Sequence, residues 1–89
     1  MGYSYTPNDI EDFFDKNKIV SSMAPSFWWR AIPAACEIGF GVGKIDSSTI
    51  TIITPDHKKL IYKGLKGPDS LTYLGIVLTH AILTTKHHD

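Results

Sequence analysis

Residues 48–63, STITIITPDHKKLIYK, carry the clearest β signal of the chain and decide its fold class. From residue 48 to residue 54, threonine, serine and isoleucine alternate between two faces of mixed polarity, as in a half-buried strand. Residues 55–58, PDHK, are typical of a turn, and residues 59–63 return as a second strand. The stretch therefore predicts an antiparallel β-hairpin. Because two strands are only marginally stable, helices must cover one face or a second copy of the chain must extend the sheet.

A helix is signalled on the N-terminal side of this hairpin. Thr6 is a suitable N-cap, Pro7 fits the first helical position, and Asp9 stands where a capping box has its acidic residue. One buried face is expected from the spacing of Ile10, Phe13 and Phe14. Asn17 is a plausible left-handed terminator, so we expect a helix from about Pro7 to Asn17.

A second helix is signalled on the C-terminal side, over residues 71–83. Asp69 or Ser70 can cap it, and its apolar residues spread beyond one stripe onto the other sides. We therefore expect a central helix with few solvated faces. Gly75 and Thr79 allow a close helix crossing, either with the same helix of a second subunit or around an aromatic ring in the core.

Residues 21–44, SSMAPSFWWRAIPAACEIGFGVGK, differ from the segments on either side. They contain two adjacent indoles, the only arginine, the only cysteine and a proline in mid-segment. We expect a helix that starts near Pro25 and bends or restarts at Pro33, whose ring would collide with the preceding turn. The glycines at 39, 41 and 43 are expected to end this helix and form a flexible or closely approached connection into the strands. This contrast in composition predicts that the working surface lies here.

Together these signals predict a small α+β protein with the order helix, helix, β-hairpin, helix. Residues 1–89 form one compact domain, with residues 1–5 and 86–89 frayed at its ends. A chain of 89 residues leaves much apolar surface uncovered, so we expect a dimer or higher oligomer that completes or covers the sheet.

Composition narrows the classes of function. The formal net charge of zero argues against a general binder of extended nucleic acid. A single cysteine and the absence of a cationic, apolar leader favour the cytoplasm. The longest apolar block, residues 71–83, is shorter than the roughly 20 residues that span a bilayer, so no membrane segment is expected.

Catalysis is not favoured by the motifs. Cys36 with His57 or His80 would supply a nucleophile and a base, but no local signature brings them together, and a lone cysteine is usually a small buried residue. The glycines of residues 39–44 follow a helix and precede a strand, the reverse of a phosphate-binding loop. The histidines at 87 and 88 lack further metal ligands at suitable spacing. We expect no enzyme, no cofactor and no metal.

The residues around the two indoles suggest a binding site instead. An exposed indole can stack on a base, an arginine can clamp a phosphate, and a helix start with hydroxyls can accept an anion. The predicted ligand-binding residues are Ser22, Ser26, Trp28, Trp29, Arg30, Lys44 and Lys59. The opposing interpretation is that the two indoles point into the core while Arg30 extends to solvent.

Three functions remain open on this basis. The first is a non-enzymatic protein that sequesters a small anionic, nucleotide-like signal between subunits; its size and style are those of a phage-encoded sponge or inhibitor. The second is an inhibitor or adaptor that binds a protein partner through Phe27, Trp28 and Trp29. The third is an enzyme that uses Cys36 or a histidine.

Overall fold

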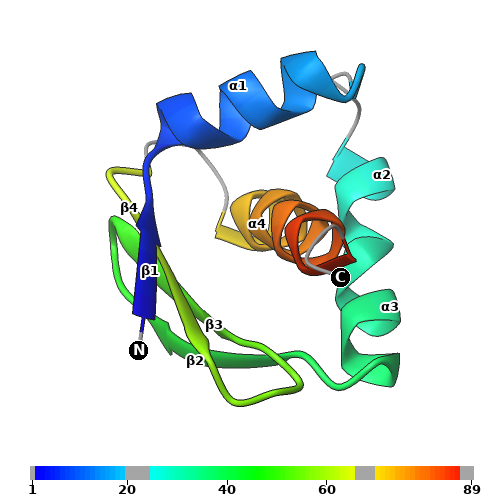
Figure 1. Cartoon of the computed structure of the whole chain (residues 1–89), viewed down its shortest axis with the longest axis vertical. Helices are drawn as coiled ribbons and strands as arrows, with labels where there is room; N and C mark the ends of the chain where they lie inside the picture. The colour runs from blue at the N-terminus through cyan, green and yellow to red at the C-terminus, as the bar shows by residue number, and fades with distance from the viewer. Residues whose placement is uncertain (1, 20–24, 66–69, 87–89) are drawn as a thin grey trace.

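A mixed four-stranded sheet and a central helix organise the chain in a computed structural model, which describes residues 2–19, 25–65 and 70–86 (Figure 1). The elements in order are β1 (Gly2–Tyr5), α1 (Pro7–Lys16), α2 (Pro25–Trp29), α3 (Ala31–Glu37), β2 (Gly41–Ile45), β3 (Thr49–Ile53), β4 (Lys59–Lys63) and α4 (Ser70–Lys86). Helix α4 lies between the sheet on one side and α2 and α3 on the other, and α1 spans the end of both layers (Figure 1). The predicted α+β class is confirmed.

The strand order in the sheet is β1-β4-β3-β2. Strands β3 and β4 form the predicted antiparallel hairpin, in which Ile50 lies opposite Tyr62 and Ile52 opposite Leu60. All four of these side chains are buried, and Tyr62 lies within hydrogen-bond distance of His80 of α4, so this face of the hairpin meets α4. The chain itself widens the hairpin, because β1 pairs with β4 in parallel and β2 pairs with β3 antiparallel.

Two segments predicted to be irregular are strands, which corrects the sequence analysis. Residues 2–5, expected to be frayed, form β1, and Tyr5 lies opposite Tyr62 with ring centroids 5.2 Å apart. The glycines at 41 and 43, expected to belong to a flexible or closely approached connection, lie in β2 (residues 41–45). Gly39, with φ +99°, makes the turn that separates this strand from α3. Strand β1 is stabilised by pairing with residues 59–62, far away in the sequence, whereas β2 pairs with the next strand, β3, across a short turn.

The start of α1 agrees with the prediction. The Asp9 backbone N–H donates to the Thr6 hydroxyl over 3.3 Å, and the Thr6 backbone N–H donates to the Asp9 carboxylate over 2.8 Å. This reciprocal capping box gives hydrogen-bond partners to two backbone N–H groups that have none within the helix. The helix buries Ile10 and Phe14.

Two helix boundaries differ from the prediction. The left-handed residue after α1 is Lys18, with φ 58°, whereas Asn17 has φ −100°. The break in the second helical segment falls at Arg30 and not at Pro33. Pro33 is the third residue of α3, within the first turn, where a backbone N–H has no partner inside the helix. The proline is therefore accommodated without ending the helix.

Helix α4 is central as predicted, and its glycine explains how closely α2 approaches it. A β-carbon added at Gly75 would lie 2.2 Å from the carbonyl oxygen of Trp28 and 2.8 Å from its Cβ. The Trp28 ring stacks on Phe14 of α1, with centroids 5.5 Å apart and planes 2° apart. The close crossing that Gly75 permits is therefore with α2 of the same chain and involves an aromatic core residue.

This contact generates a prediction for Gly75→Ala. Alanine normally stabilises a helix by about 1 kcal/mol relative to glycine. Here the added carbon meets backbone atoms of α2, so we expect net destabilisation by about 1 to 3 kcal/mol. Gly43→Ala is the matched control, because its added carbon makes only ordinary contacts at 3.5 Å or more. Urea unfolding of both variants checks the difference, and an unchanged or raised stability of Gly75→Ala would contradict the close crossing.

Candidate functional site

The two adjacent indoles have opposite environments. Trp28 is 1% exposed and belongs to the core, whereas Trp29 is 45% exposed. Trp28 is therefore not accessible for stacking on a ligand in this arrangement, and Trp29 is. Phe27, 44% exposed, makes a T-shaped contact with the buried Trp28 ring, with centroids 5.1 Å apart. The interpretation as a core residue is therefore confirmed for Trp28, and the binding role of Trp29 stays a prediction.

The exposure of Trp29 follows from a helical stripe that continues from α2 into α3. Residues facing α4 recur at 28, 31, 32 and 35, and all are buried or half-buried. Arg30 retains helical backbone angles, φ −65° and ψ −22°, and its N–H donates to the Phe27 carbonyl over 3.3 Å. The periodicity therefore persists across the break, and the two helices stand end to end (Figure 1).

The opposite stripe is the surface that we call the α2–α3 outer face. It consists of Ser26, Trp29, Arg30, Pro33, Ala34 and Glu37, all of which are exposed. Among the described residues, Arg30 forms no salt bridge. The outer face thus presents one large aromatic ring and one unpaired guanidinium, with the small side chains of Pro33 and Ala34 beside them.

The remaining predicted site residues lie elsewhere or outside the described residues. Ser22 is among the residues that the structure does not describe. Lys44 lies on β2 and forms a surface salt bridge with Asp46 over 3.7 Å. Lys59 lies on β4, exposed. Because α4 separates the sheet from α2 and α3, Arg30 does not share a site with Lys59 within one chain (Figure 1).

Cys36 is exposed, which corrects the expectation of a buried thiol. The reason is register: Ala35 faces α4 and is 1% exposed, so its neighbour points outward. His80 is buried on α4 and His57 is exposed in the hairpin turn. No group of three potential metal ligands occurs among the described residues, and no helix there is long and apolar enough to cross a membrane.

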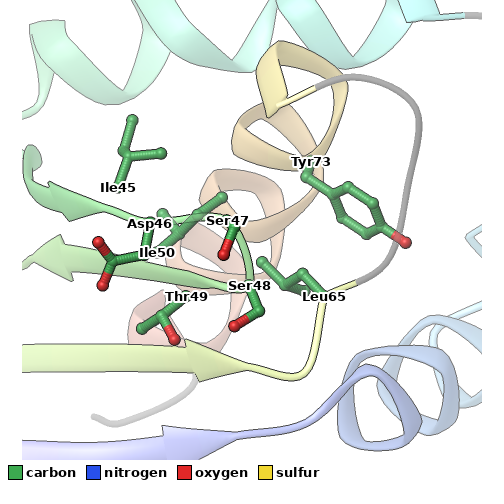
Figure 2. Close-up of a pocket in the computed structure, with 8 residues that line it drawn as sticks. All are labelled: Ile45, Asp46, Ser47, Ser48, Thr49, Ile50, Leu65 and Tyr73. Atoms are coloured by element: carbon green, nitrogen blue, oxygen red, sulfur yellow. The ribbon is translucent and has the colours of Figure 1, made fainter.

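A pocket of about 110 Å³ lies where the turn between β2 and β3 approaches the start of α4 (Figure 2). Its lining residues are Ile45, Asp46, Ser47, Ser48, Thr49, Ile50, Leu65 and Tyr73. The turn is held by the Asp46 N–H, which donates to the Thr49 carbonyl over 2.7 Å. The Asp46 carboxylate and the Tyr73 hydroxyl stand at opposite ends of the group (Figure 2). The lining includes the Asp46 carboxylate, whose negative charge makes the pocket unfavourable for an anion, although Lys44 lies 3.7 Å from it.

A buried polar pair lies at the other end of α4. The Tyr62 hydroxyl and His80 Nδ1 are 2.8 Å apart, and both residues are 2% exposed or less. The Tyr5 ring stacks on Tyr62, and the rings of Tyr5 and Phe13 each meet His80 edge-on. The Thr84 hydroxyl donates to the His80 carbonyl. Every side-chain polar atom that is fully buried among the described residues has a hydrogen-bond partner.

Burial sets the protonation of this pair. It lowers the pKa of His80 to about 4, an effect that the Asp9 carboxylate only partly opposes, and it raises the pKa of Tyr62. At neutral pH His80 is therefore uncharged and a poor base for catalysis. Sequence reasoning singled out His80 only as a potential base, and nothing local in the sequence pointed to Tyr62 as its partner. We interpret the pair as a satisfied polar element of the core.

The pair predicts how stability depends on pH. Because the pKa of His80 is lower in the folded chain than its ordinary 6.5, the unfolded state binds more protons between those values. The free energy of unfolding should therefore fall as pH drops from about 6.5 to about 4, by up to about 3 kcal/mol. His80→Gln should lose this component of the slope, whereas His57→Asn, at the exposed turn, should keep it. Denaturant melts at several pH values check this, and an unchanged slope in His80→Gln would contradict it.

Comparisons with protein-family models, with curated proteins and with solved structures find no match for this chain. We therefore infer a function from the chemistry of the chain's own surfaces. Of the features described above, the Tyr62–His80 pair is enclosed and the turn pocket carries a paired carboxylate. The α2–α3 outer face has the exposed Trp29 ring and the Arg30 guanidinium, which forms no salt bridge within the described part of the chain.

Proposed function

We propose that this chain is a non-enzymatic binding protein that docks onto a protein partner through the α2–α3 outer face. The proposal is based mainly on the exposure of Trp29. Its side chain is 45% exposed, whereas that of its neighbour Trp28 is buried in the core. Burying apolar surface is favourable by about 25 cal/mol per Å². A large apolar ring at the surface gains this free energy only when a partner covers it.

The neighbours of Trp29 suit a macromolecular interface. Trp and Arg are the residue types most often found at energetic hot spots. Pro33 and Ala34, one turn further along, are exposed and small, so a partner can approach the helix closely. Phe27 extends the apolar surface on one flank with 44% exposure. An outward helix face of this kind fits a groove on a partner, whereas small ligands are usually held in concave pockets.

A second candidate function is the binding of a small anionic ligand. Ser26, Trp29 and Arg30 stand three and four positions apart on one exposed face, so a hydroxyl, an aromatic ring and a guanidinium are available together. A nucleotide-like molecule could stack on the ring while its phosphate pairs with Arg30. The lysines of the sheet would join such a site only from a second copy of the chain. A protein of this type would act as a sponge or inhibitor of a nucleotide signal.

Site-specific photo-cross-linking tests the proposed docking face. A photoreactive amino acid at Ala34 should give a discrete heavier adduct in the cells that produce the protein, and the same amino acid at Ser47 of the β2–β3 turn should not. Trp29→Ala should weaken partner binding by about 30-fold or more, the effect of a hot spot worth at least about 2 kcal/mol. The fold should survive because Trp29 lies outside the core.

The adduct identifies which interaction occurs. A mass equal to the chain plus a different protein that is lost in Trp29→Ala supports the proposal. An adduct of two copies of this chain would replace it with self-association through the same face. Equal labelling from Ala34 and Ser47, or no adduct from Ala34, would contradict docking at this face.

Calorimetric titration tests the second candidate. A panel of mono-, di- and cyclic nucleotides is added to the wild type and to Arg30→Ala at two salt concentrations. If a phosphate pairs with Arg30, the variant should bind about 10-fold to 100-fold more weakly, as expected for a charge-assisted contact, and salt should weaken wild-type binding. Lys63→Ala, on the sheet, is the control for a general loss of positive charge. Failure of the wild type to bind any nucleotide excludes this class of ligand.

A further inference from the structure

The two edge strands of the sheet are protected to different degrees. Strand β2 carries Lys44 and has a shift of register between Val42 and Ile45, and both features hinder pairing with another strand. Strand β1, GYSY, has no charge and no proline, and its four residues pair with β4 in unbroken register. Among the described residues, no strand other than β4 pairs with it. The edge at β1 thus lacks the charge, the proline and the bulge that protect other edge strands, and only its short length limits strand addition.

The inner side of β1 also has incompletely covered surface. Tyr3 and Tyr5 lie opposite the buried Leu60 and Tyr62, so their side chains point to the face that holds α4. Tyr3 is nevertheless 45% exposed. A pocket of about 70 Å³ lies beside these rings, lined by Tyr3, Tyr5, Thr54, Asp56, Lys58, Leu60, Thr84 and Thr85. A strand added at this edge would place alternate side chains against Tyr3 and over the pocket.

We infer that a second copy of the chain occupies this edge, with β1 of each copy paired antiparallel across a two-fold axis. An uncharged strand is compatible with itself, because no like charges meet in such a pairing. With Ser4 on the axis, the two serines meet on the outer face and Tyr3 of each copy faces Tyr5 of the other on the inner face. Cross-strand aromatic pairs of this kind stabilise sheets.

The opposite edge does not offer this arrangement. A two-fold pairing of β2 would bring Lys44 of each copy close to its counterpart, and the irregular register would interrupt the ladder. Pairing through β1 instead joins the two sheets into one continuous sheet. A four-residue strand covers less area than the roughly 1,200 Å² of a standard interface, so the dimer is weak and depends on concentration.

Charge variants at Ser4 test the pairing by sedimentation across a wide dilution series. The wild type should dimerise at high concentration. Ser4→Lys and Ser4→Glu should each be monomeric because like charges meet at the axis, and an equimolar mixture of the two should form a heterodimer. Val42→Lys, on the other edge strand, is the matched control and should dimerise as the wild type does. Circular dichroism confirms that each variant is folded.

Hydrogen exchange on the wild type gives an independent measurement that needs no substitution. Backbone amides of residues 3–5 that β4 does not bind should exchange freely at low concentration and become protected at high concentration, while those of residues 42–45 on the opposite edge should not change. A wild type that stays monomeric, a dimer that persists in Ser4→Lys, or a dimer abolished by Val42→Lys would each overturn the inference.

Discussion

The contact between Trp28 and Gly75 is the constraint on which the rest of the structure depends. With no side chain at Gly75, the backbone of α2 can lie against α4, and the Trp28 ring reaches Phe14 of α1. One residue thereby joins three helices. Because the helical periodicity continues into α3, the placement of Trp28 also decides that Trp29 and Arg30 face outward. The contact between Trp28 and Gly75 therefore determines both the packing of the core and which residues form the outer face.

The Tyr62–His80 pair has a comparable role on the sheet side of α4. It joins β4 to α4 by a hydrogen bond, and the rings of Tyr5 and Phe13 attach β1 and α1 to the same cluster. A buried histidine is costly when charged but acceptable when neutral and hydrogen-bonded. The cluster therefore anchors a short edge strand that has little intrinsic tendency to form, and it leaves the other side of that strand open for pairing.

The two surfaces proposed for interaction lie on opposite sides of α4 and use different physics. The α2–α3 outer face offers an aromatic ring and a guanidinium, which gain energy from burial and from a charged partner. The β1 edge offers backbone hydrogen bonds and tyrosine rings, which suit an extended strand. Because α4 separates the surfaces, one can be occupied without blocking the other (Figure 1). A dimer through β1 would therefore present two copies of the outer face.

The sequence by itself determined the elements whose signals are local. The capping box of Thr6 and Asp9 lies within one helical turn, the alternation of residues 48–54 lies within one strand, and the apolar residues 71–83 lie within one helix. Helical spacing also places Ser26, Trp29 and Arg30 on one face, but it does not decide whether that face is exposed. Tertiary structure alone decided that residues 2–5 are a strand, because β1 depends on a ladder with the distant strand β4. Residues 41–45 pair with the neighbouring strand β3, but their glycines at 41 and 43 are typical of a connection, so the strand was not predicted. Tertiary structure likewise decided which indole is buried and that His80 meets Tyr62, since both outcomes depend on the packing of α4 against elements remote in the sequence.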